Sequence, residues 1–167
     1  MHKINNPIEA TSIAYFLAYK CLMERNQEVS DYYRNNISIY IFPAVTLASL
    51  SCEIALKNHL NNVGITMKVH NLRQLFDAIP MKEQTRYTDA TVCLENYKLN
   101  VLNMEFKFNQ TEFTNALERC KLTFTNCRYL YEGIQNIDVD FIERFMFALN
   151  DEADQYESFL NGMIGKR

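Results

Sequence analysis

The chain has 167 residues, 48% of them hydrophobic, and a formal net charge of −3 at pH 7. A single domain over residues 1–167 is long enough to bury a sizeable core without disulfides or bound metals. The small net charge argues against a protein that coats nucleic acid or an anionic membrane through overall charge. Five cysteines without a CxxC pair, in a sequence that shows no secretory signal, predict reduced thiols and a cytoplasmic location.

The first predicted helix begins next to Asn6, an N-cap residue that is followed by Pro7 and the acidic Glu9. Its apolar positions recur at helical spacing as far as about Arg25. The stretch 27–36 is polar and shows no clear period, so we expect it to connect two helices.

A second helix is predicted over about 42–63, with Pro43 in its first turn and Gly64 at its C-terminal cap. The sequence is apolar almost all round between 45 and 52, so we expect this helix to be the most buried one. The uncharged run 35–52 approaches the length that spans a bilayer. Its hydroxyl side chains and the charged residues that follow favour a core helix, so we predict no membrane association.

A short helix is predicted from Asn71, which has capping-box spacing with Gln74, to the residue before Pro80. From Lys82 onward, apolar residues recur every three or four positions, which predicts a longer helix; this spacing is lost over 104–108. The last four of these residues alternate polar and apolar side chains as a strand does. Because one such run has no partner strand, we interpret it as a linker.

A helix capped by Asn109 is predicted to run to Glu132, and a last helix capped by Asp140 to reach about Met163. The fold class is therefore all-α, a bundle of four or five main helices plus a short helix. Arg128 lies at the edge of an apolar stripe on the helix that starts at Asn109. The stripe is formed by Phe113, Leu117, Cys120, Phe124, Cys127 and Tyr131.

Two pairs of opposite charges lie four residues apart in apolar surroundings, Glu53 with Lys57 and Arg128 with Glu132. Because buried charges need partners, we hypothesise one network of these four residues across opposed helices. The alternative interpretation is two ordinary surface pairs. The few histidines and the lack of a glycine-rich phosphate loop predict no metal and no cofactor.

Three segments follow one another in an informative order: Glu53-Ile-Ala-Leu-Lys57, His70-Asn-Leu-Arg-Gln-Leu-Phe76 and Arg128-Tyr-Leu-Tyr-Glu132. Over roughly 43–156 the chain resembles the HEPN superfamily of prokaryotic helical proteins, although Asn71 replaces the usual aspartate. The resemblance implies a helical bundle that often dimerises. Many members of that family are RNA-cleaving toxins or act in phage defence and RNA processing, often beside a nucleotidyltransferase-type antitoxin.

The catalytic signature of that family is an arginine followed, after four to six residues, by a histidine. The corresponding positions after Arg128 run from Gly133 to Gln135, and the sequence has no histidine beyond His70. General acid–base cleavage of RNA needs a group that titrates near neutrality, which histidine supplies without perturbation. We therefore do not expect the usual HEPN ribonuclease activity.

Our first hypothesis is a HEPN-like binding or interaction protein, a homodimer with RNA or a nucleotidyltransferase-type protein as its partner. The binding residues expected for it are Arg128, Tyr129, Lys57 and Glu53. The second hypothesis is an atypical ribonuclease toxin with a rearranged site of Arg128, Glu132 and His70. For His70 we weigh catalysis against fixing the loop before the short helix. The third hypothesis is a structural partner protein without a role in nucleic-acid biology.

Overall fold

The computed structural model describes residues 4, 6–33, 40–128 and 137–164, without the side chains of 27–33 and of Arg128. These residues form eight α-helices and one 3₁₀ turn and contain no strand, which confirms the predicted all-α class. None of the helices they form is both long and apolar enough to cross a bilayer. The elements are α1 Pro7–Tyr33, α2 Ile41–Asn62, α3 Leu72–Ala78, α4 Met81–Val101, α5 Gln110–Cys120, α6 Thr123–Arg128, α7 Val139–Leu149, η2 Ala153–Gln155 and α8 Tyr156–Ile164.

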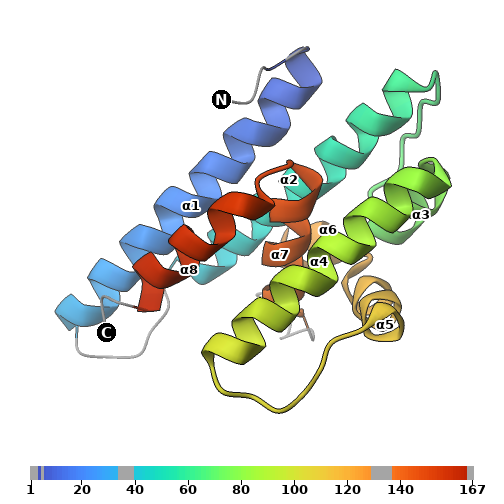
Figure 1. The fold of residues 1–167 in the computed structure, drawn as a ribbon. Helices are drawn as coiled ribbons and strands as arrows, with labels where there is room; N and C mark the ends of the chain where they lie inside the picture. The colour runs from blue at the N-terminus through green and yellow to red at the C-terminus, as the bar shows by residue number, and fades with distance from the viewer. Residues whose placement is uncertain (1–3, 5, 34–39, 129–136, 165–167) are drawn as a thin grey trace.

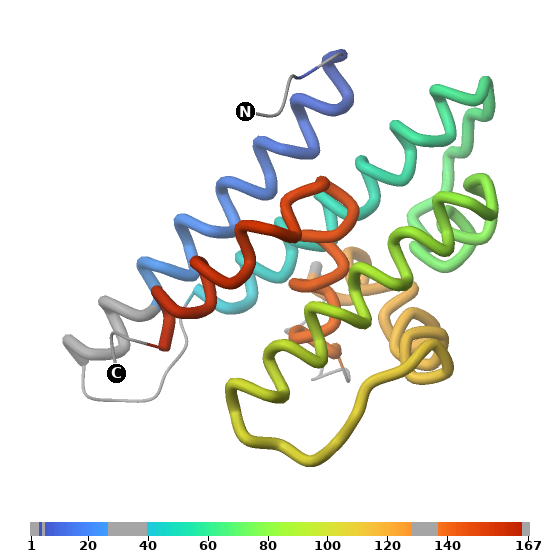
Figure 2. The backbone as a smooth tube through the Cα atoms, viewed as in Figure 1, coloured from blue at the N-terminus to red at the C-terminus, as the bar shows by residue number. Residues whose placement is uncertain are grey.

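The short helix α7 lies at the centre of the bundle. Figure 1 shows it between the long helices α2 and α4, and α5 also packs against it. Helix α1 runs antiparallel to α2 and contacts it extensively, as the trace in Figure 2 shows. Every residue from Phe141 to Asn150 is buried, whereas only 11 of the 22 residues of α2 are. The expectation that the helix over 42–63 is the most buried one is therefore wrong. The enclosed helix is α7, in which even the charged side chains of Glu143 and Arg144 are buried.

Aromatic side chains form the core around α7. Phe141 and Phe145 stack with their ring centroids 5.5 Å apart. Phe76 of α3 and Phe113 of α5 each meet Phe145 edge-on, with centroids 5.7 Å away. Each such contact contributes about 0.5–1.5 kcal/mol beyond the burial of its area. These rings tie α3 and α5 to the central helix.

The predicted N-caps at Asn6, Asn71 and Asn109 are confirmed. Asn6 Oδ1 and Asn109 Oδ1 each accept two backbone N–H groups from the first turn of their helix. Asn71 Oδ1 accepts the N–H of Gln74. Because each cap satisfies donors that have no partner inside the helix, local sequence alone defines these starting points.

Helix α1 is longer than predicted. It continues beyond Arg25 to Tyr33, through much of the stretch 27–36 that we interpreted as a connection. This part of α1 contains neither proline nor glycine, so nothing in it interrupts the backbone hydrogen bonds. The bounds of α2 and α3 agree with the prediction within one residue, and the linker at 105–108 is confirmed as irregular structure.

The continuous helix predicted over 109–132 is wrong, because α5 ends at Cys120 and α6 begins at Thr123. The Lys121 carbonyl oxygen accepts the backbone N–H of Leu72 at 2.9 Å. The Thr123 hydroxyl donates to the Cys120 carbonyl oxygen at 2.8 Å. These bonds satisfy backbone groups at the break, and α5 packs on α4 and α3 while α6 packs on α2. Of the predicted stripe, the structure buries Phe113, Leu117, Cys120 and Cys127 and half-buries Phe124, while Tyr131 lies outside the described residues.

The last helix, predicted over 140–163, is also interrupted. Its N-cap is Asp138, whose Oδ1 accepts the N–H of Phe141 at 3.0 Å, and not Asp140. After α7 the backbone of Asp151 has a φ of 56°, which is the left-handed region and ends α-helical geometry. The chain then passes through η2 into α8.

Candidate functional site

Glu53, Lys57 and His70 form a polar cluster on α2 and the segment before α3. Only 5% of the Glu53 side chain is exposed, and Lys57 Nζ lies 2.7 Å from its Oε1. His70 Nδ1 lies 3.0 Å from Oε1 and 3.1 Å from Oε2 of the same carboxylate. The His70 side chain is 60% exposed. A buried carboxylate thus holds two nitrogen groups that solvent can reach.

Packing of three elements produces this cluster. Glu53 and Lys57 lie one turn apart on α2, and His70 directly precedes Asn71, the N-cap of α3. Helix α2 packs against both α3 and α6, and the His70 ring centroid lies 5.9 Å from that of Phe124 on α6. An unpaired buried carboxylate is destabilising, so its contacts with Lys57 and His70 hold the segment before α3 against α2.

The structure therefore brings together Glu53, Lys57 and His70, three of the residues singled out from the sequence. Arg128 is the last residue of α6, a helix that packs against α2, but its side chain is outside the described part of the chain. Tyr129 and Glu132 also lie outside the described residues. Participation of Arg128 and Glu132 in a common network with Glu53 stays a prediction.

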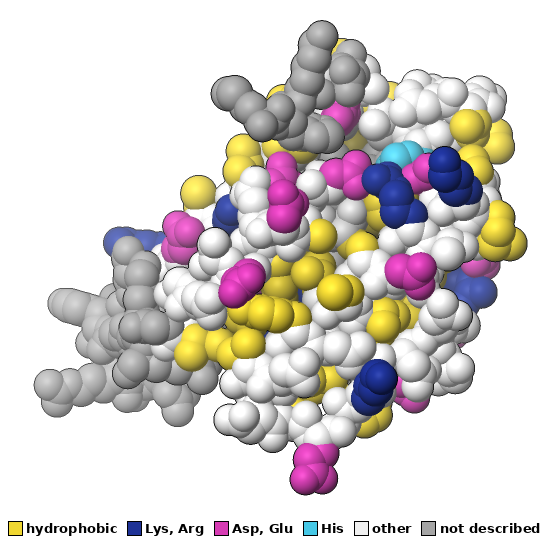
Figure 3. Space-filling model, viewed as in Figure 1, with side chains coloured by type: hydrophobic (Ala, Val, Ile, Leu, Met, Phe, Trp, Pro, Cys, Tyr) yellow, Lys and Arg dark blue, Asp and Glu magenta, His cyan; other side chains and the backbone are white. Residues whose placement is uncertain are grey.

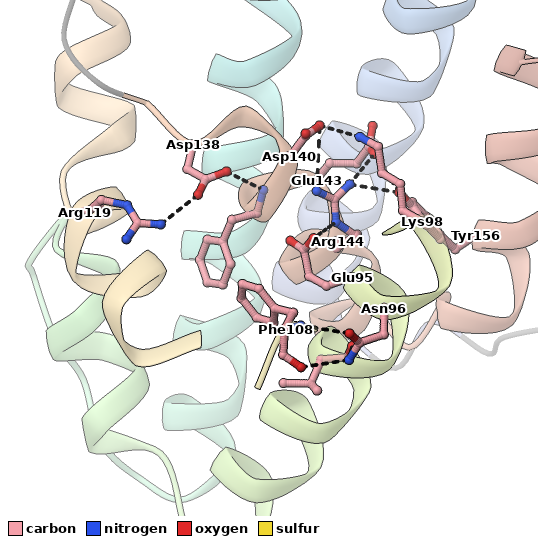
Figure 4. A network of polar contacts seen from close by, with 12 residues as sticks. Glu95, Asn96, Lys98, Phe108, Arg119, Asp138, Asp140, Glu143, Arg144 and Tyr156 are labelled. Carbon is pink, nitrogen blue, oxygen red and sulfur yellow. Dashed lines mark hydrogen bonds and ion pairs between the residues drawn. The ribbon is translucent and has the colours of Figure 1, made fainter. Parts of the chain in front are cut away.

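The most deeply buried cation among the described residues is Arg144, which the sequence analysis did not single out. Only 1% of its side chain is exposed. Its guanidinium lies between the carboxylates of Glu95 and Glu143 and the hydroxyl of Tyr156, as Figure 4 shows. Arg144 Nε is 2.8 Å from Glu95 Oε2, but the N–H direction makes this an ion pair rather than an aligned hydrogen bond. Arg144 Nη1 is 3.3 Å from Glu143 Oε1 and 3.0 Å from Tyr156 Oη.

Glu143 extends this cluster to α1 and α8. The hydroxyl of Tyr19 on α1 donates to Glu143 Oε2, and the hydroxyl of Tyr156 on α8 donates to Oε1 at 3.1 Å. Burial, together with the charge of Glu143, raises the pKa of Tyr19 and of Tyr156. Burial also raises the pKa of Glu95, and the charge of Arg144 opposes that rise. The cluster links α1, α4, α7 and α8, and its burial makes it a structural element rather than a binding surface.

The sequence does contain one indication of the Arg144 cluster. Glu143 and Arg144 are adjacent opposite charges inside the otherwise apolar run from Phe141 to Leu149. A helix with so few polar positions is buried on most sides, so charges on it need partners from other helices. The identity of the partners Glu95 and Tyr156 depends on packing and has no local signal.

A third polar cluster surrounds His59 near the end of α2. His59 Nε2 and the hydroxyl of Tyr87 on α4 are hydrogen-bonded, and Arg86 Nη2 donates to the same hydroxyl. Arg86 Nη1 lies 2.8 Å from Asp151 Oδ1, and Arg86 Nε lies 2.9 Å from Glu83 Oε2. Burial lowers the pKa of His59, and the nearby charge of Arg86 acts in the same direction. Tyr87 is too distant from His59 in the chain for sequence spacing to reveal this contact.

The described residues contain no group of three or more histidine, cysteine, aspartate or glutamate side chains arranged to hold a metal ion. All five cysteines are free thiols. Comparisons with protein-family models, with curated proteins and with solved structures find no match for this chain.

Proposed function

We propose that this chain is a HEPN-like helical module that binds single-stranded RNA in the cytoplasm, in RNA processing or phage defence, and does so without the usual HEPN ribonuclease chemistry. The observation that supports it most is the contact between Glu53 and His70. Two of the segments that carry the resemblance, separate in the sequence, meet there in one cluster.

The cluster has the groups that a phosphate contact requires. Lys57 and His70 keep 27% and 60% of their side chains exposed while Glu53 orients both. With His70 Nδ1 donating to Glu53, Nε2 of the ring is left for an external partner and becomes a donor when the ring is protonated. Arg128 is the last residue of α6, a helix that packs against α2, and we expect it from the resemblance to be a further cation for the phosphate backbone.

The same geometry favours a second candidate function, RNA cleavage at a rearranged site. A carboxylate that holds one nitrogen of an imidazole leaves the other nitrogen oriented for proton transfer. His70 would move the proton, and Arg128 would stabilise charge on the phosphate. Binding comes first because the arginine and histidine lack the family's spacing in this sequence.

Fluorescence anisotropy with labelled single-stranded RNA at low and at physiological salt tests the binding proposal. We expect binding that weakens as salt rises, and weaker binding with a smaller salt dependence for Lys57→Ala and Arg128→Ala. Lys107→Ala, which removes an exposed lysine in the connection between α4 and α5, is the matched control and leaves binding unchanged. Absence of binding at low salt contradicts the proposal and favours a structural partner protein.

A denaturing gel of the same RNA after incubation tests cleavage. Intact RNA is the expected result. Cleavage that disappears in His70→Gln and Arg128→Ala, while both variants keep the wild-type thermal melt, would instead assign the ribonuclease activity. The resemblance also implies a homodimer and a nucleotidyltransferase-type partner. Light scattering at micromolar concentration tests the dimer, and a monomer there contradicts it.

A further inference from the structure

A polar cleft lies where α2 ends and α4 begins, apart from the Glu53 cluster. It consists of two hollows of about 250 Å³ and about 520 Å³, and His59 and Asn62 line both of them. Figure 3 shows acidic and basic side chains gathered around a histidine on the face in view. The histidine that lines both hollows, His59, packs against the buried Tyr87, and the two ring centroids are 5.1 Å apart.

The hydrogen-bond network assigns the proton of His59. Arg86 donates to the Tyr87 hydroxyl oxygen, so the single proton of that hydroxyl is free to go to His59 Nε2. Nε2 is then the acceptor, and the neutral ring carries its own proton on Nδ1. Nδ1 has no hydrogen-bond partner among the described residues. The cleft therefore contains an uncharged donor whose orientation is fixed by the fold.

The smaller hollow adds further donors and acceptors. Asn58 is only 9% exposed, and its Oδ1 accepts from Asn6 Nδ2 at 3.0 Å. The amide N–H groups of Asn58 have no partner in the described part of the chain. Asn62 contributes an accessible amide, and Asp151 contributes a carboxylate that Arg86 holds by one oxygen. These donors face the hollow and reach solvent, so an external ligand that accepts from them can replace water there.

The rest of the lining restricts the ligand. Ile13, Ala55 and Leu149 form an apolar part of the wall of the smaller hollow, which suits a flat ring face. Glu9 and Asp151 line the same hollow and repel an anion, so free phosphate or a carboxylate is a poor ligand there. A neutral planar group with adjacent donors and acceptors along its edge fits these features.

We propose that this cleft binds a nucleobase, with Asn58, Asn62 and His59 donating to its edge and the carboxylate of Asp151 accepting from it. The inference deepens the proposed function and depends on it for the source of the base, which is a free nucleoside or an unpaired base in single-stranded RNA. A base in RNA would place its ribose and phosphate towards the larger hollow. Lys82 and Arg86 line that hollow together with Glu83, which pairs with Arg86.

Side-chain NMR of the histidine rings tests the proposal, because the chain has only three histidines and His59→Gln identifies the signals of His59. Adenosine, guanosine, cytidine and uridine are titrated separately, with ribose and inorganic phosphate as controls. We expect at least one nucleoside to shift the His59 signals saturably and to leave those of His70 in place. Ribose and phosphate have no such effect.

Two neighbouring asparagines provide a matched pair of variants. Asn62→Ala removes an amide of the cleft and weakens nucleoside binding by about two- to tenfold, the effect of one hydrogen bond. Asn61→Ala removes an exposed amide from the same turn of α2 outside the cleft and leaves binding unchanged. Both positions are exposed, so both variants fold.

The outcomes separate this inference from the proposed function. If no nucleoside shifts the His59 signals, or if ribose or phosphate shifts them equally, the nucleobase site is overturned. RNA binding in the anisotropy experiment, with no change in the His59 NMR signals on addition of either a nucleoside or the RNA, also overturns it, while the proposed function stands. Nucleoside binding at His59 without RNA binding supports the cleft as a site for free nucleosides and removes the proposed function.

Discussion

His70 Nδ1 contacts both carboxylate oxygens of Glu53, at 3.0 Å and 3.1 Å, and so joins the segment before α3 to the middle of α2. The carboxylate is buried and the imidazole is exposed. Lys57 neutralises the same carboxylate from the next turn of α2. The arrangement makes Glu53 the residue on which the cluster depends, and its removal is the first test of the structure.

Glu53→Gln is expected to lower the free energy of unfolding by about 1–3 kcal/mol, because the amide is a weaker partner for Lys57 and for His70 in a buried position. Urea denaturation followed by circular dichroism measures the change. Glu105→Gln, at an exposed position in the connection between α4 and α5, is the control and shifts stability by less than about 0.5 kcal/mol. Equal effects of the two substitutions would contradict the buried cluster.

Arg144→Ala is expected to destabilise the protein by about 3–5 kcal/mol, because it leaves Glu95 and Glu143 buried without their cation. The measurement is the same urea titration. Arg119→Ala removes an arginine whose side chain is 51% exposed and pairs with Asp138, and it costs about 0–1 kcal/mol. A loss below about 1 kcal/mol for Arg144→Ala would show that the cluster does not stabilise the fold.

Tyr19→Phe tests the connection between α1 and α7. It removes the hydroxyl that donates to Glu143 and leaves one oxygen of a buried carboxylate with one partner fewer. We expect a loss of about 1–3 kcal/mol in the free energy of unfolding. Tyr15→Phe changes the same residue type at a half-buried position of α1 and leaves stability nearly unchanged. Similar losses for both variants would mean that the hydroxyl of Tyr19 has no special partner.

His59 makes stability depend on pH in a defined direction. Burial holds the pKa of His59 below its ordinary value of 6.5, so the folded protein keeps the ring neutral at a pH where the unfolded chain protonates it. Between the lowered pKa and 6.5 the unfolded chain therefore binds more protons, and this contribution to stability is lost as the pH falls through that window. Glu83, Arg86, Asp151 and Glu9 are the charged groups that act on the ring.

The check for His59 compares urea titrations of the wild type and of His59→Gln between pH 5 and pH 8. The free energy of unfolding of the wild type should exceed that of His59→Gln most at pH 8. This difference should shrink as the pH falls towards 5, since glutamine has no proton to gain. A difference that grows on acidification would show that His59 is protonated in the fold.

The five thiols are expected to react at different rates. Cys21 and Cys93 are exposed, whereas Cys52, Cys120 and Cys127 are buried. Burial raises the pKa of Cys120 to about 11, so little thiolate is present at neutral pH. Alkylation of the native protein followed by peptide mass spectrometry should label Cys21 and Cys93 first. Early labelling of Cys52 would contradict its burial, and labelling in denaturant shows that all five sites can react.

Local sequence was sufficient to predict those structural features whose physical cause lies within a few residues. The N-caps at Asn6, Asn71 and Asn109 depend on one side chain and the next turn, and the Glu53–Lys57 pair depends on helical spacing alone. The break between α5 and α6 was not predictable in this way. The Lys121 carbonyl group at the break is satisfied by Leu72 of α3, and no pattern within the segment indicates that contact.

The sequence by itself determined that the protein is all-α, where most of its helices begin, and that Glu53 and Lys57 belong together, because helix propensity, capping and i,i+4 spacing act over a few residues. Only the tertiary structure decided that α7 is the enclosed helix, that Arg144 is the buried cation, and that His70 reaches Glu53 while His59 reaches Tyr87. Those contacts join residues far apart in the chain, and they form only when the packing of whole helices brings the side chains within hydrogen-bonding distance.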